Sequence, residues 1–303
     1  ATDPALAAVC YAALGKSCAW RRVSRSEGDS LMRAYFKKAM ANPGLLAQKK
    51  AGDYGPFTVE GRDAALFGGD LLSLIGYTAK DYKAMHDYYS TTQNRTATML
   101  TALDMVKQRA EESGDIRVWQ LEGSRYVASL DSLISLYGDI EACGEVAIAR
   151  YVFYSSCRDT DAGQCVKLIN EYLARWGAWP RMEQLRNSLK QLTNPQFQAF
   201  ETPSVVLPGK PFTVKLSVRN IGRLTFTLTR LNTNGGEKRT PNNNNDLKRL
   251  KVLAVGGTKQ TFTRAYTGHK DYETVDDSLL VGGLPVGVYL LEMTADKKGI
   301  DTD

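Results

Sequence analysis

The sequence is poor in the side chains that most often do chemistry. Its 303 residues include two histidines, His86 and His269, and five cysteines whose spacing fits no zinc-binding pattern. The motifs of serine hydrolases, phosphate-binding loops, zinc proteases and dinucleotide-binding folds are all missing. A general base must lie within hydrogen-bond distance of the proton it removes, and neither histidine has a nucleophile near it in the sequence. We therefore expect no catalytic residues, no metal site and no cofactor, and a protein that is not an enzyme.

Long apolar runs and concentrated charge are missing as well. No stretch approaches the ~20 consecutive apolar residues that a membrane span needs. The chain starts at Ala1 without the basic segment of a secretory signal, which indicates a processed chain whose targeting segment has been removed. The net charge of +6 is spread evenly, without the basic stripe typical of nucleic-acid binding. We therefore expect no nucleic-acid partner.

The cysteines leave two alternatives open. Cys157 and Cys165 flank a polar stretch that a disulfide could close, and Cys10 could pair with Cys18 in the same way. Buried free thiols, which are common in globular proteins, are the other alternative. The sequence does not decide between a disulfide-containing and a reduced chain.

What the chain does contain is a change of hydrophobic period near Pro195. Before this point, apolar residues recur close to every 3.6 residues, in segments separated by Gly and Pro. The clearest of these segments covers residues 95–112, and Thr78-Ala-Lys-Asp81 has the spelling of a capping box at a helix start. Residues 1–195 are thus predicted to form an all-α helical-hairpin array of the tetratricopeptide type, with a compact irregular bundle as the alternative.

After Pro195 the period is two. Apolar residues occupy every second position from Phe212 to Val218, which places one face of a strand in a core and the other in water. We predict strands near residues 203–206, 212–219, 224–231, 251–254, 261–265, 277–281 and 287–295. Seven short strands of this kind are typical of an antiparallel β-sandwich of the immunoglobulin or fibronectin type. The polar run at residues 235–245 is predicted to be a mobile surface loop. The chain is thus expected to be a multidomain α+β protein with domains at residues 1–195 and 196–303.

A cluster of aromatic and basic residues lies just before the change of period. The sequence Trp176-Gly-Ala-Trp179-Pro-Arg181-Met continues to Leu185-Arg186. Two tryptophans around a glycine, next to a proline at the first position of a helix, would pack a tight helix–helix corner. Tryptophan and arginine are also the residues that dominate binding hot spots. We predict that Trp176, Trp179, Arg181 and Arg186 form a domain-junction corner or a protein-interaction site.

A set of motifs in this region resembles one known family. They are Trp176 to Asn187, Leu192-Thr-Asn-Pro195-Gln-Phe197, Val205-Val-Leu-Pro208, Val214 to Ile221, Asp271-Tyr272, and Leu284-Pro-Val-Gly287-Val-Tyr289. With them the chain resembles the bacterial alpha-2-macroglobulin family, especially its long members in Bacteroidetes. The resemblance implies an N-terminal helical region that runs into the first macroglobulin-like domain, a seven-stranded sandwich. It also implies a fragment of a larger protein, without that protein's bait and thioester regions.

Family members trap proteases, and many capture them with an internal thioester spelled Cys-Gly-Glu-Gln. In this chain Cys143-Gly-Glu145 is followed by Val146, so the glutamine that would form the thioester is missing. The triplet also lies in the first domain, whereas the family thioester lies in a much later one. No reactive role is therefore transferred to Cys143.

The resemblance implies a non-catalytic N-terminal fragment of a protease inhibitor of the bacterial cell envelope, acting as scaffold or docking region. Its partner would be a protein, either a protease or an envelope component. The expected location is the periplasm or the outer envelope, with a membrane reached only through an anchor of the full-length protein. The alternative is a helical-repeat adaptor that binds a protein in a groove and carries an immunoglobulin-like spacer domain.

Overall fold

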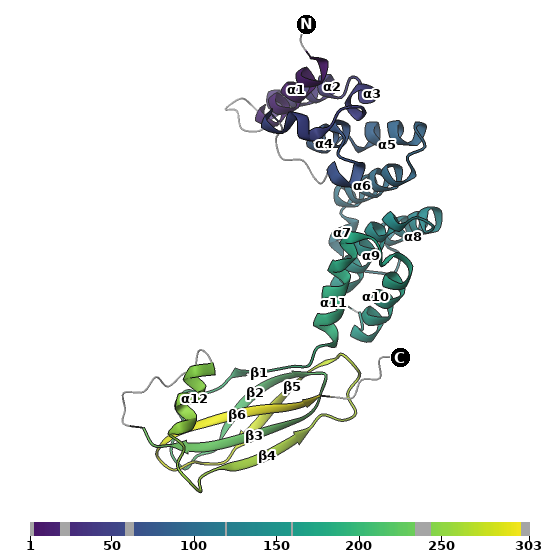
Figure 1. Cartoon of the computed structure of the whole chain (residues 1–303). Coiled ribbons are helices and arrows are strands. Elements are labelled where there is room, and N and C mark those ends of the chain that lie inside the picture. Colours follow the sequence, from purple (N-terminus) through teal and green to yellow (C-terminus); the bar gives the residue numbers. More distant parts are fainter. Residues whose placement is uncertain are drawn as a thin grey trace. The chain divides into compact units, whose positions relative to one another are not determined.

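The computed structural model describes residues 3–18, 25–57, 64–118, 120–158, 160–233 and 244–297. The chain divides into two compact units (Figure 1). One contains Ala1–Thr160 and Leu168–Leu185 and is called the helical unit below; the other contains Asp161–Lys167 and Arg186–Asp303 and is called the β unit. None of the helices in the described part of the chain has the length and apolar character that a membrane span requires.

Short polar caps start many of the helices. Asp70, Asp81, Asn94 and Ser124 each accept a hydrogen bond from the backbone N–H three residues further on, at 2.8–3.3 Å.

The described part of the chain before Pro195 is helical. Its α-helices are α1 (Pro4–Cys18), α2 (Arg25–Ala39), α3 (Pro43–Ala47), α4 (Leu71–Ala79), α5 (Tyr82–Thr91), α6 (Arg95–Ser113), α7 (Asp115–Val118), α8 (Arg125–Tyr137), α9 (Gly144–Ser156), α10 (Ala162–Trp176) and α11 (Glu183–Thr193). Short 3₁₀ helices in the described residues are η1 (Ala51–Phe57), η2 (Ala64–Phe67), η3 (Glu141–Cys143) and η4 (Pro180–Met182).

Several helices that are close in the sequence also pack against one another. Helix α1 packs on α2, α5 on α6, α6 on α8 and α8 on α9, as Figure 1 shows. The prediction that the first part of the chain is helical is confirmed by these elements.

The helix boundary at Thr78–Asp81 differs from the predicted capping box. Helix α4 continues through this motif as far as Ala79, and the Thr78 hydroxyl donates to the carbonyl oxygen of Leu74 at 2.9 Å. Lys80 then takes a left-handed φ of 55°, and Asp81 alone caps α5 through the backbone N–H of Ala84. Thr78 cannot act as the cap because its hydroxyl is already bonded inside the preceding helix.

The described residues of the β unit form two antiparallel three-stranded sheets. Its strands are β1 (Gln196–Glu201), β2 (Phe212–Arg219), β3 (Ile221–Leu231), β4 (Gln260–Ala265), β5 (Thr274–Val281) and β6 (Val288–Lys297), and helix α12 (Asn244–Val252) lies between β3 and β4 in the sequence. The sheet orders are β1-β2-β5 and β4-β3-β6. The α+β class is therefore confirmed.

One hydrophobic cluster contains side chains from both sheets. Val214, Leu216 and Val218 of β2 are at most 2% exposed, and Phe226 of β3 is fully buried. Because full burial of a large apolar side chain contributes roughly 1.5–3 kcal/mol, this cluster stabilises the β unit substantially. The alternation read from the sequence thus selects the correct inward face of β2.

The prediction of seven strands is wrong for the described residues, which form six. Residues 203–206 form no strand, because Pro203 and Pro208 lack backbone N–H donors; Val205 there is 85% exposed. Residues 251–254 include the end of α12, and Ala254 makes only an isolated bridge to Leu231. Strand β1 was not predicted. Of the predicted mobile loop at residues 235–245, residues 235–243 lie outside the described residues, and residues 244–245 are the first two residues of α12.

Candidate functional site

The predicted tryptophans form a packed corner of the helical unit. Trp176, at the end of α10, is 1% exposed, and its indole N–H donates to the carbonyl oxygen of Gly138 at 3.0 Å. The guanidinium of Arg175 lies 4.3 Å from the centre of the Trp176 ring. Trp179 directly precedes η4, and its indole N–H donates to Oε1 of Glu145 at 2.8 Å. Both indole donors are thus satisfied inside the unit, as a packing corner requires.

Glu145 is the charged centre of this corner. Its side chain is 5% exposed, and Oε1 lies 3.3 Å from Nε of Arg181. Gly144 allows the close approach, because a Cβ at this position would lie 3.1 Å from Sδ of Met182 and 3.2 Å from Cδ1 of Trp179. The structure therefore brings two of the four predicted residues, Trp179 and Arg181, together at one buried carboxylate, whereas Trp176 bonds to the Gly138 carbonyl. The fourth, Arg186, is half-buried and belongs to the β unit.

The thiol of Cys143 is held in its neutral form. Cys143 is fully buried, and this burial raises the pKa of its thiol to about 11. All five cysteines are free thiols, with Cys10 exposed and the other four buried. Neither Cys10–Cys18 nor Cys157–Cys165 is a disulfide in the structure. The Cys143-Gly-Glu145 triplet is explained by packing, since Gly144 and Glu145 both contact the tryptophan corner.

A second arrangement of predicted motifs lies in the β unit, at Asn220 between β2 and β3. Asn220 is 5% exposed and has a left-handed φ of 54°. Its side-chain amide donates to the carbonyl oxygens of Leu192 at 2.6 Å and Asn194 at 3.3 Å. Its carbonyl oxygen Oδ1 accepts from the backbone N–H of Tyr272 at 3.1 Å. One side chain therefore holds three segments of the β unit that are distant in the sequence.

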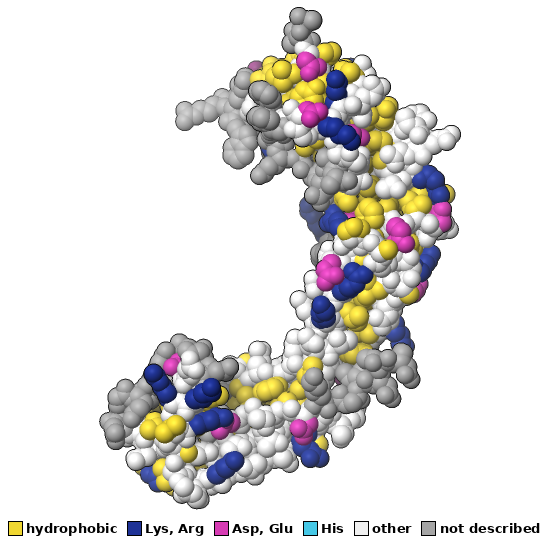
Figure 2. Space-filling view, in the orientation of Figure 1, with side chains coloured by type: hydrophobic (Ala, Val, Ile, Leu, Met, Phe, Trp, Pro, Cys, Tyr) yellow, Lys and Arg dark blue, Asp and Glu magenta, His cyan; other side chains and the backbone are white. Residues whose placement is uncertain are grey.

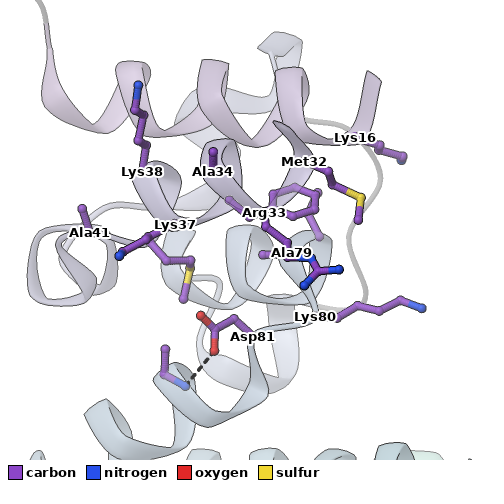
Figure 3. A pocket seen from close by; sticks show the side chains of 14 residues that line it. Lys16, Met32, Arg33, Ala34, Lys37, Lys38, Ala41, Ala79, Lys80 and Asp81 are labelled. Carbon is purple, nitrogen blue, oxygen red and sulfur yellow. Dashed lines mark hydrogen bonds between the residues drawn. The ribbon is translucent and has the colours of Figure 1, made fainter. Parts of the chain in front are cut away.

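A concave site that was not predicted lies in the helical unit (Figure 3). It has a volume of about 1350 Å³ and is bounded by α1, α2 and the corner between α4 and α5. Its floor is apolar and its rim carries five cations, Lys16, Arg33, Lys37, Lys38 and Lys80. Figure 3 shows Lys16, Arg33 and Lys80 on the right of this basic groove and Lys37 and Lys38 on the left.

The cations of the basic groove have no ion-pair partner among the described residues. Within the part of the chain that the structure describes, none of the five lies within salt-bridge distance of a carboxylate. Asp81 is the acidic residue of the lining, and its carboxylate accepts from the Ala84 N–H at the start of α5. The Nζ atom of Lys38 lies 5.5 Å from the centre of the Tyr11 ring and makes a cation–π contact with it. The groove is therefore a local excess of positive charge.

Sequence reasoning missed the groove because its walls come from helices distant in the sequence. The available signal was the spacing of Arg33 and Lys37, which are four residues apart and share one face of α2. Elsewhere basic and acidic side chains are interspersed over each unit on the face shown in Figure 2. Among the described residues no group of three or more histidines, cysteines or acidic residues could hold a metal ion.

Comparisons of this chain with protein-family models, with curated proteins and with solved structures found no match in any of the three. Function is therefore inferred from the residues and their geometry.

Proposed function

We propose that this chain is a non-catalytic part of an alpha-2-macroglobulin-like protease inhibitor of the bacterial cell envelope, where it acts as a scaffold and docking region. The observation that carries the proposal is the convergence on Asn220. Asn220 lies in the motif from Val214 to Ile221 and bonds to the motif that contains Leu192 and Asn194 and to Tyr272 of the Asp271-Tyr272 motif. These are three of the motifs on which the resemblance to that family rests. Family motifs that maintain the fold of one domain are expected to contact one another, as these do through the hydrogen bonds of Asn220. Motifs that match by chance would be expected to lie far apart in the structure.

The same proposal assigns a type to each unit. We assign the β unit to the macroglobulin-like domains, a relative of the immunoglobulin and fibronectin sandwiches, because two antiparallel sheets share one hydrophobic cluster. We assign the helical unit to degenerate tetratricopeptide-like arrays, because several helices that are neighbours in the sequence pack as pairs, among them α1 with α2, α5 with α6 and α8 with α9. The proposed partner is a protease or an envelope protein, in the periplasm or on the outer envelope, and the membrane anchor would belong to the full-length protein.

The proposal is tested on the complete protein that contains this segment. It is incubated with serine, cysteine and metallo-endopeptidases, and digestion of casein is compared with cleavage of a small chromogenic peptide. We expect casein digestion to fall while peptide cleavage persists, because a trapped protease is shielded from large substrates only. Residues 1–303 alone should neither inhibit the proteases nor hydrolyse either substrate. Undiminished casein digestion with every protease, or hydrolysis by residues 1–303, would contradict the proposal.

A second candidate function is a helical adaptor with the β unit as spacer, and the basic groove favours it. An adaptor binds its partner whether or not a protease has acted. Binding of a partner by the intact chain, with no inhibition by the complete protein in the casein assay, would select this candidate over the first.

A further inference from the structure

We infer that the basic groove between α2 and the α4–α5 corner is a docking site for an acidic amphipathic helix of a partner protein. The inference deepens the docking role proposed above, since it names the surface and the chemistry of the partner. It depends on three observations: closely packed walls, an apolar floor, and a rim of cations that form no ion pair with any residue the structure describes.

Two close helix contacts fix the walls. Gly15 of α1 lies against the Phe36 ring of α2, where a Cβ would be 2.6 Å from Cε1. Gly76 of α4 lies against Met85 of α5, where a Cβ would be 2.3 Å from Sδ. The Phe36 and Met85 side chains fill the space at these glycines and leave no room for a Cβ there, so each pair is tightly packed, and α1 also packs on α4. The groove between the pairs is therefore pre-formed, which lowers the entropic cost of binding.

The floor suits the apolar face of a helix. Met32, Ala34 and Phe36 of α2 line it together with Ala79 of α4, and Met32 and Phe36 are half-buried. Methionine adapts its shape to different partners, and helix-in-groove recognition commonly uses such surfaces. A volume of about 1350 Å³ is above the roughly 300–1,000 Å³ of small-molecule pockets, so a peptide segment is the better match.

The rim selects an acidic partner. Arg33 and Lys37 stand four residues apart on α2, a spacing at which like charges destabilise a helix. Lys80 adds a third cation from the opposite wall. A helix with Leu on one face and Glu on the other would place its apolar face on the floor and its carboxylates at these cations. Charge complementarity therefore points to an acidic helix.

Other anionic or apolar partners fit less well. A lipid surface is flat, whereas the apolar residues here lie on the floor of a concave site, and Met40 at its edge is 6% exposed. A second copy of the chain carries the same net charge of +6, which disfavours it as the acidic partner. Both occupants are distinguished in the experiment.

The test uses the full chain and a fluorescein-labelled peptide of about five helical turns, roughly 18 residues, with a Leu face and a Glu face. Two control peptides have Lys in place of Glu, or the same residues in shuffled order. Fluorescence anisotropy is measured at about 0.15 M salt and at higher salt. We expect saturable binding of the acidic amphipathic peptide, weakened by salt, and at least about tenfold weaker binding of either control.

The groove is then altered in two ways, each with a matched control. The triple variant Arg33→Glu/Lys37→Glu/Lys80→Glu should bind the acidic peptide at least about tenfold more weakly. Its control, Arg109→Glu/Arg125→Glu/Arg158→Glu, changes exposed cations outside the groove and should stay within about twofold. Ala34→Tyr fills the floor without changing charge and should also weaken binding; the exposed Ala128→Tyr on α8 is its control. Thermal unfolding by circular dichroism checks that each variant folds.

Several results would overturn the inference. The peptide could fail to bind saturably, or both triple variants could lose affinity equally, which would indicate unspecific charge attraction. Binding of phosphatidylglycerol vesicles that depends on the groove, with no peptide binding, would assign it to a lipid surface. Self-association lost in the groove variant would assign it to a second copy. Because no protease is present, failure here is distinct from failure of the casein assay.

Discussion

At the residue scale, Asn220 combines two properties that few side chains offer together. Asparagine tolerates a left-handed backbone better than other non-glycine residues, and its amide both donates and accepts. The φ of 54° and the bonds to Leu192, Asn194 and Tyr272 use both properties. The sequence marks Asn220 only as the end of an alternating run, because its three partners become neighbours through tertiary folding.

Replacing Asn220 tests this node. Asn220→Ala loses all three hydrogen bonds. Alanine also tolerates a φ of 54° poorly, because it has a Cβ but no polar side chain that could bond to the nearby backbone. We therefore expect the free energy of unfolding to fall by about 2–4 kcal/mol. Asn220→Gly keeps the backbone relaxed and should lose about 1 kcal/mol less. Asn220→Asp places a carboxylate near two carbonyl oxygens and should be at least as harmful as alanine. Calorimetry measures the change, and hydrogen exchange assigns it to β2 and β3. A loss below about 0.5 kcal/mol in Asn220→Ala would contradict the assignment.

At the element scale, the contact of α9 with η4 shows what the sequence could and could not predict. The two tryptophans around Gly177 and the proline at the start of η4 predict a tight corner, and the structure has one at Trp176–Trp179. Their acceptors could not be predicted, because Glu145 is 34 residues from Trp179 and Gly138 is 38 residues from Trp176. Local patterns specify a corner, whereas the identity of the partner depends on the packing of separate helices.

Removing the carboxylate of Glu145 should destabilise this corner. Glu145→Ala leaves the Trp179 N–H without its acceptor and Arg181 without this buried counter-charge, so we expect a loss of about 2–4 kcal/mol. Glu145→Gln keeps an acceptor for the indole and should cost less. The exposed Glu141→Ala in η3 serves as the control and should change stability by less than about 0.5 kcal/mol. Urea unfolding followed by tryptophan fluorescence gives the values. Equal stability of Glu145→Ala and Glu141→Ala would refute this role of the corner.

At the scale of the whole molecule, the spacing of apolar residues distinguishes the helical part of the chain from the β part, but it does not predict every strand. Alternation in β2 identifies Val214, Leu216 and Val218 as core residues, and all three are buried. It fails at Val205, whose neighbourhood is rich in proline, and at residues 251–254, where the last turn of α12 contains apolar residues. It misses β1, whose six residues are all exposed and carry no buried-face signal. Edge strands and helix ends depend on tertiary pairing more than on local apolar content.

The two units should unfold separately. Leu216→Asp buries a charge in the cluster of the β unit, where Leu216 is 1% exposed, and should unfold that unit. All four tryptophans precede Pro195, so tryptophan fluorescence reports on the helical part. We expect its urea midpoint to be unchanged in Leu216→Asp, while hydrogen exchange shows β2 and β3 unprotected. The exposed Thr213→Asp on the same strand is the control. A shifted fluorescence midpoint in Leu216→Asp alone would show that the units unfold as one.

The ladder registers have a mechanical consequence. Strand β1 begins at Gln196 opposite Arg219, and β6 ends at Lys297 opposite Ile221, so the first residue of β1 and the last residue of β6 lie at the same end of the β unit. Tension along the polypeptide would pull these strands apart from that end and peel their ladders one rung at a time, instead of shearing all rungs at once. A β unit pulled from Gln196 and Lys297 would therefore unfold and lengthen at low force.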